Sequence, residues 1–222
     1  MTPTVGLEAL KPVLAEAQRR SLIGASLTLS GQIAHSEAFL RILLLETIDR
    51  PVLELGSGGG LPGLVMAVES RDLRLVLLDS KRRSTEFLNW AVGELQLSPR
   101  VSVVNARAEQ LGRDTDYRGQ FAAVVARSFG PPAVTAESAA GFLRVGGRLI
   151  VSEPPANTAV GASPEGPPSA DRWPTEGCGE VGLTPEAVLR GEFGFAVLRQ
   201  TVSCPDRYPR RPGIPSKRPL FG

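Results

Sequence analysis

The sequence predicts an α/β fold, with a mostly parallel, Rossmann-like sheet preceded by a helical extension. Three observations predict it. Short apolar runs alternate with helix-length segments from residue 52 onward, which is typical of βαβ units. The first of these runs leads straight into a glycine-rich turn, and a stretch of helical pattern over residues 1–50 comes before it.

Composition limits the class of protein. The chain has 222 residues, 42% of them hydrophobic and 22% charged, which indicates one folded globular domain and excludes disordered and fibrous classes. A net charge of +2 is too small to mark the whole chain as a nucleic-acid binder, so any basic surface must be local. Two cysteines outside any CxxC or Cys/His spacing predict neither a disulfide framework nor a zinc site.

The ends and apolar stretches of the chain predict its location. The N-terminus lacks the pattern of a secretory signal, and no run approaches the roughly 18 apolar residues of a membrane span. We therefore expect a cytoplasmic protein without membrane association.

The helical extension is expected to hold two helices. In the first, Leu10, Val13, Leu14 and Ala17 recur at helical spacing, and Pro12 is tolerable in a first turn. The second is expected over Gln32–Thr47, after a linker over Gly24–Gly31.

The remaining elements alternate. Strands are expected at Val52–Leu55, Leu73–Leu78, Val101–Val104, Ala122–Ala126 and Arg148–Val151. Helices are expected at Leu61–Glu69, Lys81–Leu95 and Pro132–Leu143, the last stopped by Gly146 or Gly147. A surface loop over 154–185 and a closing strand pair at Phe193–Leu198 and Arg199–Cys204 should follow. This divides the chain into a helical extension (1–50), a core (51–206) and a basic tail (207–222).

The sharpest motif is VLELGSGGGLPG, residues 52–63, in which a strand leads into a glycine turn and then a helix. Glycine is needed where φ must be positive and where backbone approaches a ligand closely. The start of the following helix offers free N–H groups and the positive end of the helix dipole. The motif predicts a site for a nucleotide-like ligand.

Two ligand classes compete for this turn. The spacing of the dinucleotide fingerprint is matched by Gly58, Gly60 and Gly63. The pattern E/DxGxGxG, similar to motif I of class I S-adenosylmethionine methyltransferases, is matched by Glu54, Gly56, Gly58 and Gly60. Asp79 suits ribose hydroxyls in either interpretation. The helical extension and the segment LRVGGRLIV, residues 143–151, favour the methyltransferase, in which Glu54 would take the ammonium of the cofactor.

Longer segments resemble one family, the bacterial RsmG (GidB) methyltransferases of 16S ribosomal RNA. The resemblance lies in ELGSGGGLPG (54–63), LLDSKRRSTEFL (77–88), ARAE (106–109), VVARSF (124–129) and YPRRPGIPSKRPL (208–220). It implies the class I methyltransferase fold with a seven-stranded sheet, S-adenosylmethionine as cofactor, and methylation of N7 of a guanine. The expected partner is 16S rRNA or the small ribosomal subunit, and the expected state is a monomer.

The resemblance also implies roles for individual residues. Gly56 and Leu61 would line the cofactor, Asp79 would lie near its ribose, and Ala108 and Glu109 would bracket its adenine. Arg127 would face the reaction site, as a substrate-positioning residue and cofactor neighbour. RNA phosphates would be met by basic residues at the start of one helix and in an extended, proline-rich tail. These are Lys81, Arg82, Arg207, Arg210, Arg211, Lys217 and Arg218.

Two departures from the family keep other functions open. Where the family has Asp-Ser, three residues after a His that matches His35, this chain has Ala38-Phe39, and where it has Lys-Gly after the fifth strand this chain has Glu153-Pro154. A methyltransferase of the same fold acting on another RNA, a protein or a small molecule is one alternative, and a non-catalytic cofactor-binding module is another. His35 is the only histidine, so a His-based metal site or triad is excluded.

Overall fold

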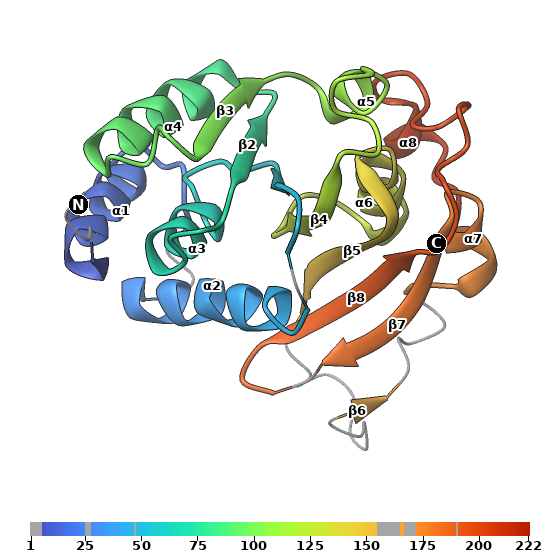
Figure 1. Ribbon diagram of the computed structural model, residues 1–222, viewed down its shortest axis with the longest axis horizontal. Helices are drawn as coiled ribbons and strands as arrows, with labels where there is room; N and C mark the ends of the chain where they lie inside the picture. Colours follow the sequence, from blue (N-terminus) through green and yellow to red (C-terminus); the bar gives the residue numbers. More distant parts are fainter. Residues whose placement is uncertain (1–5, 25–27, 47, 155–164, 167–171, 190) are drawn as a thin grey trace. The chain divides into compact units, whose positions relative to one another are not determined.

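The computed structural model describes residues 6–24, 28–46, 48–154, 165–166, 172–189 and 191–222. They form two compact units (Figure 1). Unit 1 extends up to Ala106, and unit 2 runs from Arg107 to Gly222. Each unit has its own share of strands with helices packed on them.

Unit 1 consists of two helices followed by two βα steps and a third strand. Its elements are α1 (Leu7–Arg19), α2 (Leu29–Leu43), β1 (Val52–Leu55), α3 (Gly63–Glu69), β2 (Leu75–Asp79), α4 (Arg82–Glu94) and β3 (Val101–Asn105). The three strands are parallel in the order β3-β2-β1, with Leu55 opposite Leu78 and Asp79 opposite Asn105. The carboxyl ends of β1 and β2 therefore meet at one edge, where the glycine turn begins.

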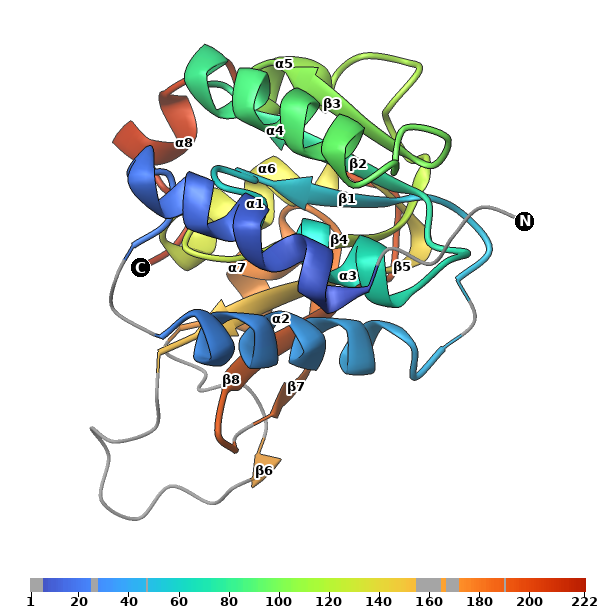
Figure 2. The ribbon, with the colours of Figure 1, turned by 90° about the vertical axis from the view of Figure 1, so that its left-hand side faces the viewer.

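The helical extension packs on this unit as amphipathic helices do. The four expected core residues of α1, Leu10, Val13, Leu14 and Ala17, are buried. In Figure 2, α1 lies between α4 and the pair α2 and α3, and contacts join α1 to α3 and α4, and α2 to α3. Pro12 lies inside α1 beyond its first turn, which corrects the expected placement.

The second helix lies earlier than expected. It begins at Leu29 because the Thr28 hydroxyl accepts a hydrogen bond from the Gly31 N–H, and it ends at Leu43 rather than Thr47. The expected linker up to Gly31 is therefore shorter at its C-terminal end.

Unit 2 contains the remaining strands. Its elements are α5 (Ala108–Leu111), β4 (Phe121–Ala126), α6 (Pro132–Ala140), β5 (Leu143–Glu153), β6 (Glu165–Gly166), α7 (Thr175–Gly179), β7 (Leu183–Leu189), β8 (Gly194–Gln200) and α8 (Ile214–Lys217). β4 and β5 are parallel, whereas the β5–β8, β7–β8 and β6–β7 pairs are antiparallel. Apart from the two-residue β6, the described chain holds seven strands, and the predicted mostly parallel α/β fold is confirmed.

The segment LRVGG does not stop a helix. α6 ends at Ala140, and Leu143–Gly147 belong to β5, where they bulge out of the pairing with β4 between Phe121 and Ala123. Gly146 has a φ of +81°, and a Cβ on Gly147 would lie 2.9–3.1 Å from three backbone oxygens. Both glycines therefore serve a β-bulge.

The closing strands also differ from the expectation. The expected strands at 193–198 and 199–204 merge into the single strand β8, whose partner β7 comes before it and contains Pro185. β7 and α7 occupy part of the expected 154–185 loop, of which 155–164 and 167–171 lie outside the described residues. None of the described helices is long and apolar enough to cross a membrane.

Candidate functional site

The glycine turn between β1 and α3 needs glycine for its backbone conformation. Gly56, Gly58 and Gly60 have φ values of +68°, +50° and +87°, in the left-handed region that other residues rarely adopt. A Cβ added to Gly59 would collide with the Ile23 side chain, so this glycine is needed for packing. A Cβ on Gly58 would meet only the Leu22 and Gly56 carbonyl oxygens, at 3.6 and 3.7 Å. Both distances are ordinary van der Waals contacts, so the protein itself does not exclude a Cβ here, and glycine is required at this position by its φ.

Glu54 lies beneath this turn. Its side chain is buried and accepts a hydrogen bond from the Gly63 N–H at 3.1 Å, at the start of α3. A Cβ on Gly63 would collide with the carboxylate. Glu54 therefore joins β1 to α3, in addition to the cofactor contact that the sequence predicts.

Asp79 braces the turn from the end of β2. Its two carboxylate oxygens accept hydrogen bonds from the Gly58 N–H and the Lys81 N–H, both at 2.8 Å. Each oxygen has a further lone pair, so the buried carboxylate can still accept a hydroxyl. The structure thus brings Asp79 to Gly58, while its ribose contact stays a prediction.

The two basic residues after Asp79 are exposed. Lys81 precedes α4, and Arg82 in its first turn pairs with Glu86 at 2.8 Å, an exposed pair of small energetic value. Both stay predicted RNA contacts.

Glu109 has a role that the sequence did not indicate. Ala108 and Glu109 begin α5 and are buried. The Glu109 carboxylate accepts hydrogen bonds from Arg107 Nη2 and from the Gly213 N–H, both at 3.0 Å. Burial by itself would raise the pKa of this carboxyl, but the hydrogen bonds from Arg107, Gly213 and its own N–H lower the pKa below its ordinary value.

Arg127 directly follows β4 and is half-buried. The next residue, Ser128, has a φ of +54°, an unusual conformation for a residue with a side chain. Arg127 thus lies where the chain turns sharply away from the carboxyl end of a strand. Its contact with substrate stays a prediction.

The basic tail folds onto unit 2 and does not stay extended. Ile214–Lys217 form one helical turn, α8, because Pro215 lies in its first turn, where a proline costs no hydrogen bond. Arg207 pairs with Glu180 at 3.1 Å, and Arg210 binds the fully buried Glu137 through its backbone N–H, Nε and Nη2 at 2.8, 2.8 and 2.5 Å. Arg211, Lys217 and Arg218 are exposed.

The two departures from the family pattern have packing roles. Ala38 and Phe39 lie in the buried face of α2. The Glu153 carboxylate binds Arg172 Nε at 2.6 Å and the indole Nε1 of the buried Trp173 at 3.0 Å. Glu153 therefore fixes the segment that leads into α7.

Neither cysteine is suited to nucleophilic chemistry. Burial raises the pKa of the Cys178 thiol to about 12. Burial also raises the pKa of Cys204 to about 11, against a smaller lowering effect of Arg118. Both side chains stay neutral thiols near pH 7.

Known proteins resemble this chain along most of its length. The family model described as rRNA small subunit methyltransferase G matches residues 29–153. A Ribosomal RNA small subunit methyltransferase G from Rubrobacter xylanophilus is 33% identical over 221 residues, which cover 97% of this chain and 83% of that protein. The chain belongs to this family. A second family member, from Dictyoglomus thermophilum, is 33% identical over 181 residues, 79% of this chain and 70% of that protein.

Solved structures agree on the fold. The O-methyltransferase from Bacillus cereus, in complex with SAH, superposes with a TM-score of 0.58 at 17% identity and covers 86% of this chain and 89% of that one. At this identity the likeness shows the fold alone. Membership of the rRNA small subunit methyltransferase G family and the methyltransferase-type fold are thus both confirmed.

Proposed function

We propose that this protein transfers a methyl group from S-adenosylmethionine to N7 of a guanine in the 16S rRNA of the small ribosomal subunit. The observation that carries the proposal is the glycine turn held by Asp79, in which Gly58 has positive φ and a Cβ position that meets only two carbonyl oxygens, at van der Waals distance. Membership of a methyltransferase family supports the reaction class.

The residues of unit 1 fit this cofactor. Backbone free of side chains at Gly56, Gly58 and Gly60 allows close approach of a nucleoside. Asp79 retains lone pairs for ribose hydroxyls, and Glu54 supplies a carboxylate for an ammonium. When bound, S-adenosylmethionine supplies a methyl group already activated on a sulfonium sulfur. Leu61, buried after the turn, adds an apolar contact.

The acceptor atom sets modest demands on the protein. Guanine N7 carries an in-plane lone pair and no proton at neutral pH, so no general base is needed. The protein has to hold the base in line with the methyl group and to stabilise the cationic purine that forms. Arg127 would position the guanine through its O6 or a phosphate, and Ala108 and Glu109 would border the adenine, as the resemblance implies.

Exposed cations favour RNA as the substrate. Lys81, Arg211, Lys217 and Arg218 are exposed, and phosphate contacts by such residues give affinity that is independent of base sequence. Glu153 is the main reason to consider another substrate, but its carboxylate is bonded to Arg172 and Trp173. The monomeric state and the cytoplasmic location stay predictions.

Transfer of labelled methyl to small ribosomal subunits from a strain lacking the family enzyme tests the function. Label mapped to a guanine N7 of 16S rRNA supports it, and label on another base, on protein or on no component contradicts it. In single-turnover reactions we expect Arg127→Ala to slow transfer by about 10²-fold, as losing a positioning group does, with cofactor affinity measured in parallel. An unchanged rate would overturn the role of Arg127.

A further inference from the structure

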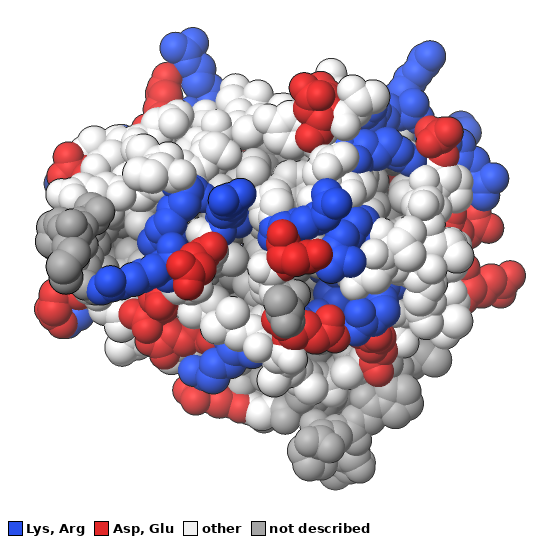
Figure 3. Space-filling model, viewed as in Figure 1, with Lys and Arg blue, Asp and Glu red and all other residues white. Residues whose placement is uncertain are grey.

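Three exposed cations lie close together around α8. They are Arg211, Lys217 and Arg218, and within the described chain no hydrogen bond or ion pair holds their side chains. Figure 3 shows Lys and Arg atoms, with Asp and Glu atoms among them, over the part of unit 2 where Figure 1 labels α5 and α8. A surface of this kind suits the phosphates of a nucleic-acid backbone.

The C-terminal end of α8 is held in place by Arg210. Its Nη2 donates to the carbonyl oxygen of Arg218 at 2.7 Å, while the same guanidinium and the Arg210 backbone N–H bind Glu137 in α6. Glu137 has no exposed surface, so this ion pair is screened little by water. The hydrogen bond to Glu137 is the largest effect on the pKa of Arg210 and raises it.

The N-terminal end of α8 is fixed separately. Gly213, with a φ of +80°, precedes the helix and donates its N–H to the buried Glu109 at 3.0 Å. Both ends of a one-turn helix are thus attached to buried carboxylates, and a helix of this length is not stable alone.

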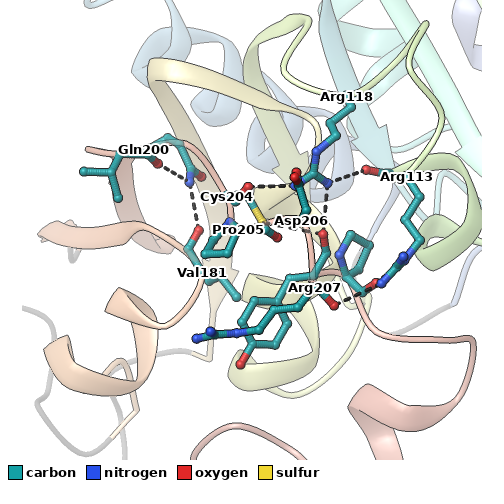
Figure 4. Close-up of polar contacts among 12 residues, drawn as sticks. Arg113, Arg118, Val181, Gln200, Cys204, Pro205, Asp206 and Arg207 are labelled. Carbon is teal, nitrogen blue, oxygen red and sulfur yellow. Dashed lines mark hydrogen bonds and ion pairs between the residues drawn. The ribbon is translucent and has the colours of Figure 1, made fainter.

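Residues 204–209, where the basic tail begins, are held by two more arginines. Arg118 donates from Nη1 to the carbonyl oxygens of Tyr208 and Gly112, and from Nη2 to that of Cys204. Arg113 donates to the carbonyl oxygens of Pro209 and Arg207, at 2.6 and 3.0 Å (Figure 4). These arginines bind backbone, so they order the tail whatever side chains it carries.

We propose that Glu137 is a positioning residue for RNA binding: through Arg210 it fixes α8 so that Arg211, Lys217 and Arg218 form a preformed phosphate-binding surface. The inference rests on the proposed function for the identity of the RNA. This inference also gives Arg210 a different role from the one expected. Because Glu137 neutralises its charge, Arg210 holds α8 in place and does not contact phosphate. Preformed cations bind phosphates more tightly because the cost of ordering the tail is already met on folding.

The test compares wild-type full-length protein with Glu137→Gln and Arg210→Lys. We expect KM for small ribosomal subunits to rise about tenfold, because the variants must order α8 when they bind RNA, a cost that wild type has already met on folding. We expect kcat and the Kd for S-adenosylmethionine to stay within about twofold, since the change acts on RNA binding alone. Binding to a 16S rRNA fragment should depend less on salt, with a slope shallower by about 0.7 for each phosphate that the variant no longer binds.

Two further variants separate positioning from folding. Lys217→Gln with Arg218→Gln removes exposed cations without touching the core, and it should raise KM as Glu137→Gln does. Adding Glu137→Gln to that double variant should then change KM little, because the groups it positions are gone. Glu186→Gln, which removes an ion pair with Arg199 elsewhere in unit 2, is the matched control and should leave KM unchanged.

The outcomes distinguish the two proposals. If wild-type protein does not methylate small-subunit RNA, the proposed function fails. The effect of Glu137→Gln on binding to the 16S rRNA fragment, and on the salt dependence of that binding, then still tests the role of Glu137. If Glu137→Gln and Arg210→Lys keep the wild-type KM and the wild-type salt dependence of RNA binding, the positioning role of Glu137 is wrong. Should Glu137→Gln fail to fold, Arg210→Lys and the surface double variant decide the question by the same readouts.

Discussion

Neighbouring glycines in the turn are required for different physical reasons. Gly59 is enclosed, since a Cβ there would collide with Ile23. A Cβ on Gly58 would make only ordinary van der Waals contacts with two carbonyl oxygens, so its requirement comes from a φ of +50° and from the ligand expected beside it. Residue type alone does not separate these reasons, whereas the space around each Cβ position does.

Substituting Gly58 tests whether the cofactor binds beside it. A valine there adds a β-branched side chain at positive φ beside the expected cofactor, so we expect S-adenosylmethionine affinity to fall by about ten- to a hundredfold, the effect of about 1–3 kcal/mol of overpacking. Isothermal titration calorimetry measures the affinity.

A second glycine provides the control for backbone strain. Gly119 has a φ of +67° and nothing within 4 Å of an added Cβ, so Gly119→Val introduces similar strain outside the glycine turn. It should cost stability and leave cofactor affinity unchanged. Normal binding by Gly58→Val, or equal loss by both variants, would contradict the pocket assignment.

At the scale of elements, the end of β5 and the start of α7 depend on each other. Glu153 closes β5, and its carboxylate holds both Arg172 and the indole of Trp173, which is 2% exposed. The acid that stands where the family resemblance implies a lysine is therefore compensated locally. It gives the indole N–H of the buried Trp173 an acceptor just before α7 begins.

Restoring a lysine at this position should therefore harm the protein. Glu153→Lys removes both hydrogen bonds and sets a cation beside Arg172, and we expect it to lower the free energy of unfolding by about 1–3 kcal/mol, the cost of leaving the indole N–H of the buried Trp173 without an acceptor. Glu153→Gln, which keeps an acceptor for Trp173, should cost about 1–2 kcal/mol and leave methylation unchanged. Urea unfolding measures both. A stable, more active Glu153→Lys enzyme would show instead that this position acts on substrate.

Elements were predictable where local sequence decides them. β1 was expected at Val52–Leu55 and found there, because a run of three apolar residues interrupted only by Glu54 leads directly into glycines. The LRVGG segment was misplaced because glycines that stop a helix and glycines that form a β-bulge look alike in sequence. α8 was missed because prolines argue against helix unless they lie in its first turn.

The parts of the site that sequence did not predict are long-range contacts. Glu109 and Gly213 are 104 positions apart, and Arg210 and Glu137 are 73 apart, so no spacing rule joins them. The glycine turn with Asp79 was predictable because its residues follow one another along successive strands. The tail was expected as basic, but its attachment depends on which carboxylates the fold buries.

At the scale of the whole molecule, the attachment of the tail makes unit 2 sensitive to acid. Glu109 holds the N–H of Gly213, and its hydrogen bonds lower its pKa in the folded protein below the ordinary value. A carboxyl with a lowered folded-state pKa stabilises the fold fully above the unfolded-state pKa of about 4.3. That stabilisation is lost as the pH falls from there through the folded-state pKa.

Glu109→Gln should reveal this contribution as a difference between two pH profiles. At pH 7 we expect the variant to be less stable than wild type by about 1.5–3 kcal/mol, the range for hydrogen bonds to a charged group. Below about pH 4.3 the difference should shrink steadily, because protonation of Glu109 in the wild type removes the same charge that the substitution removes. Urea unfolding between pH 3 and pH 7 gives both curves. A stability difference that stays constant across this range would mean that the charge of Glu109 does not stabilise the fold, and that Gly213 is held by the geometry of its acceptor alone.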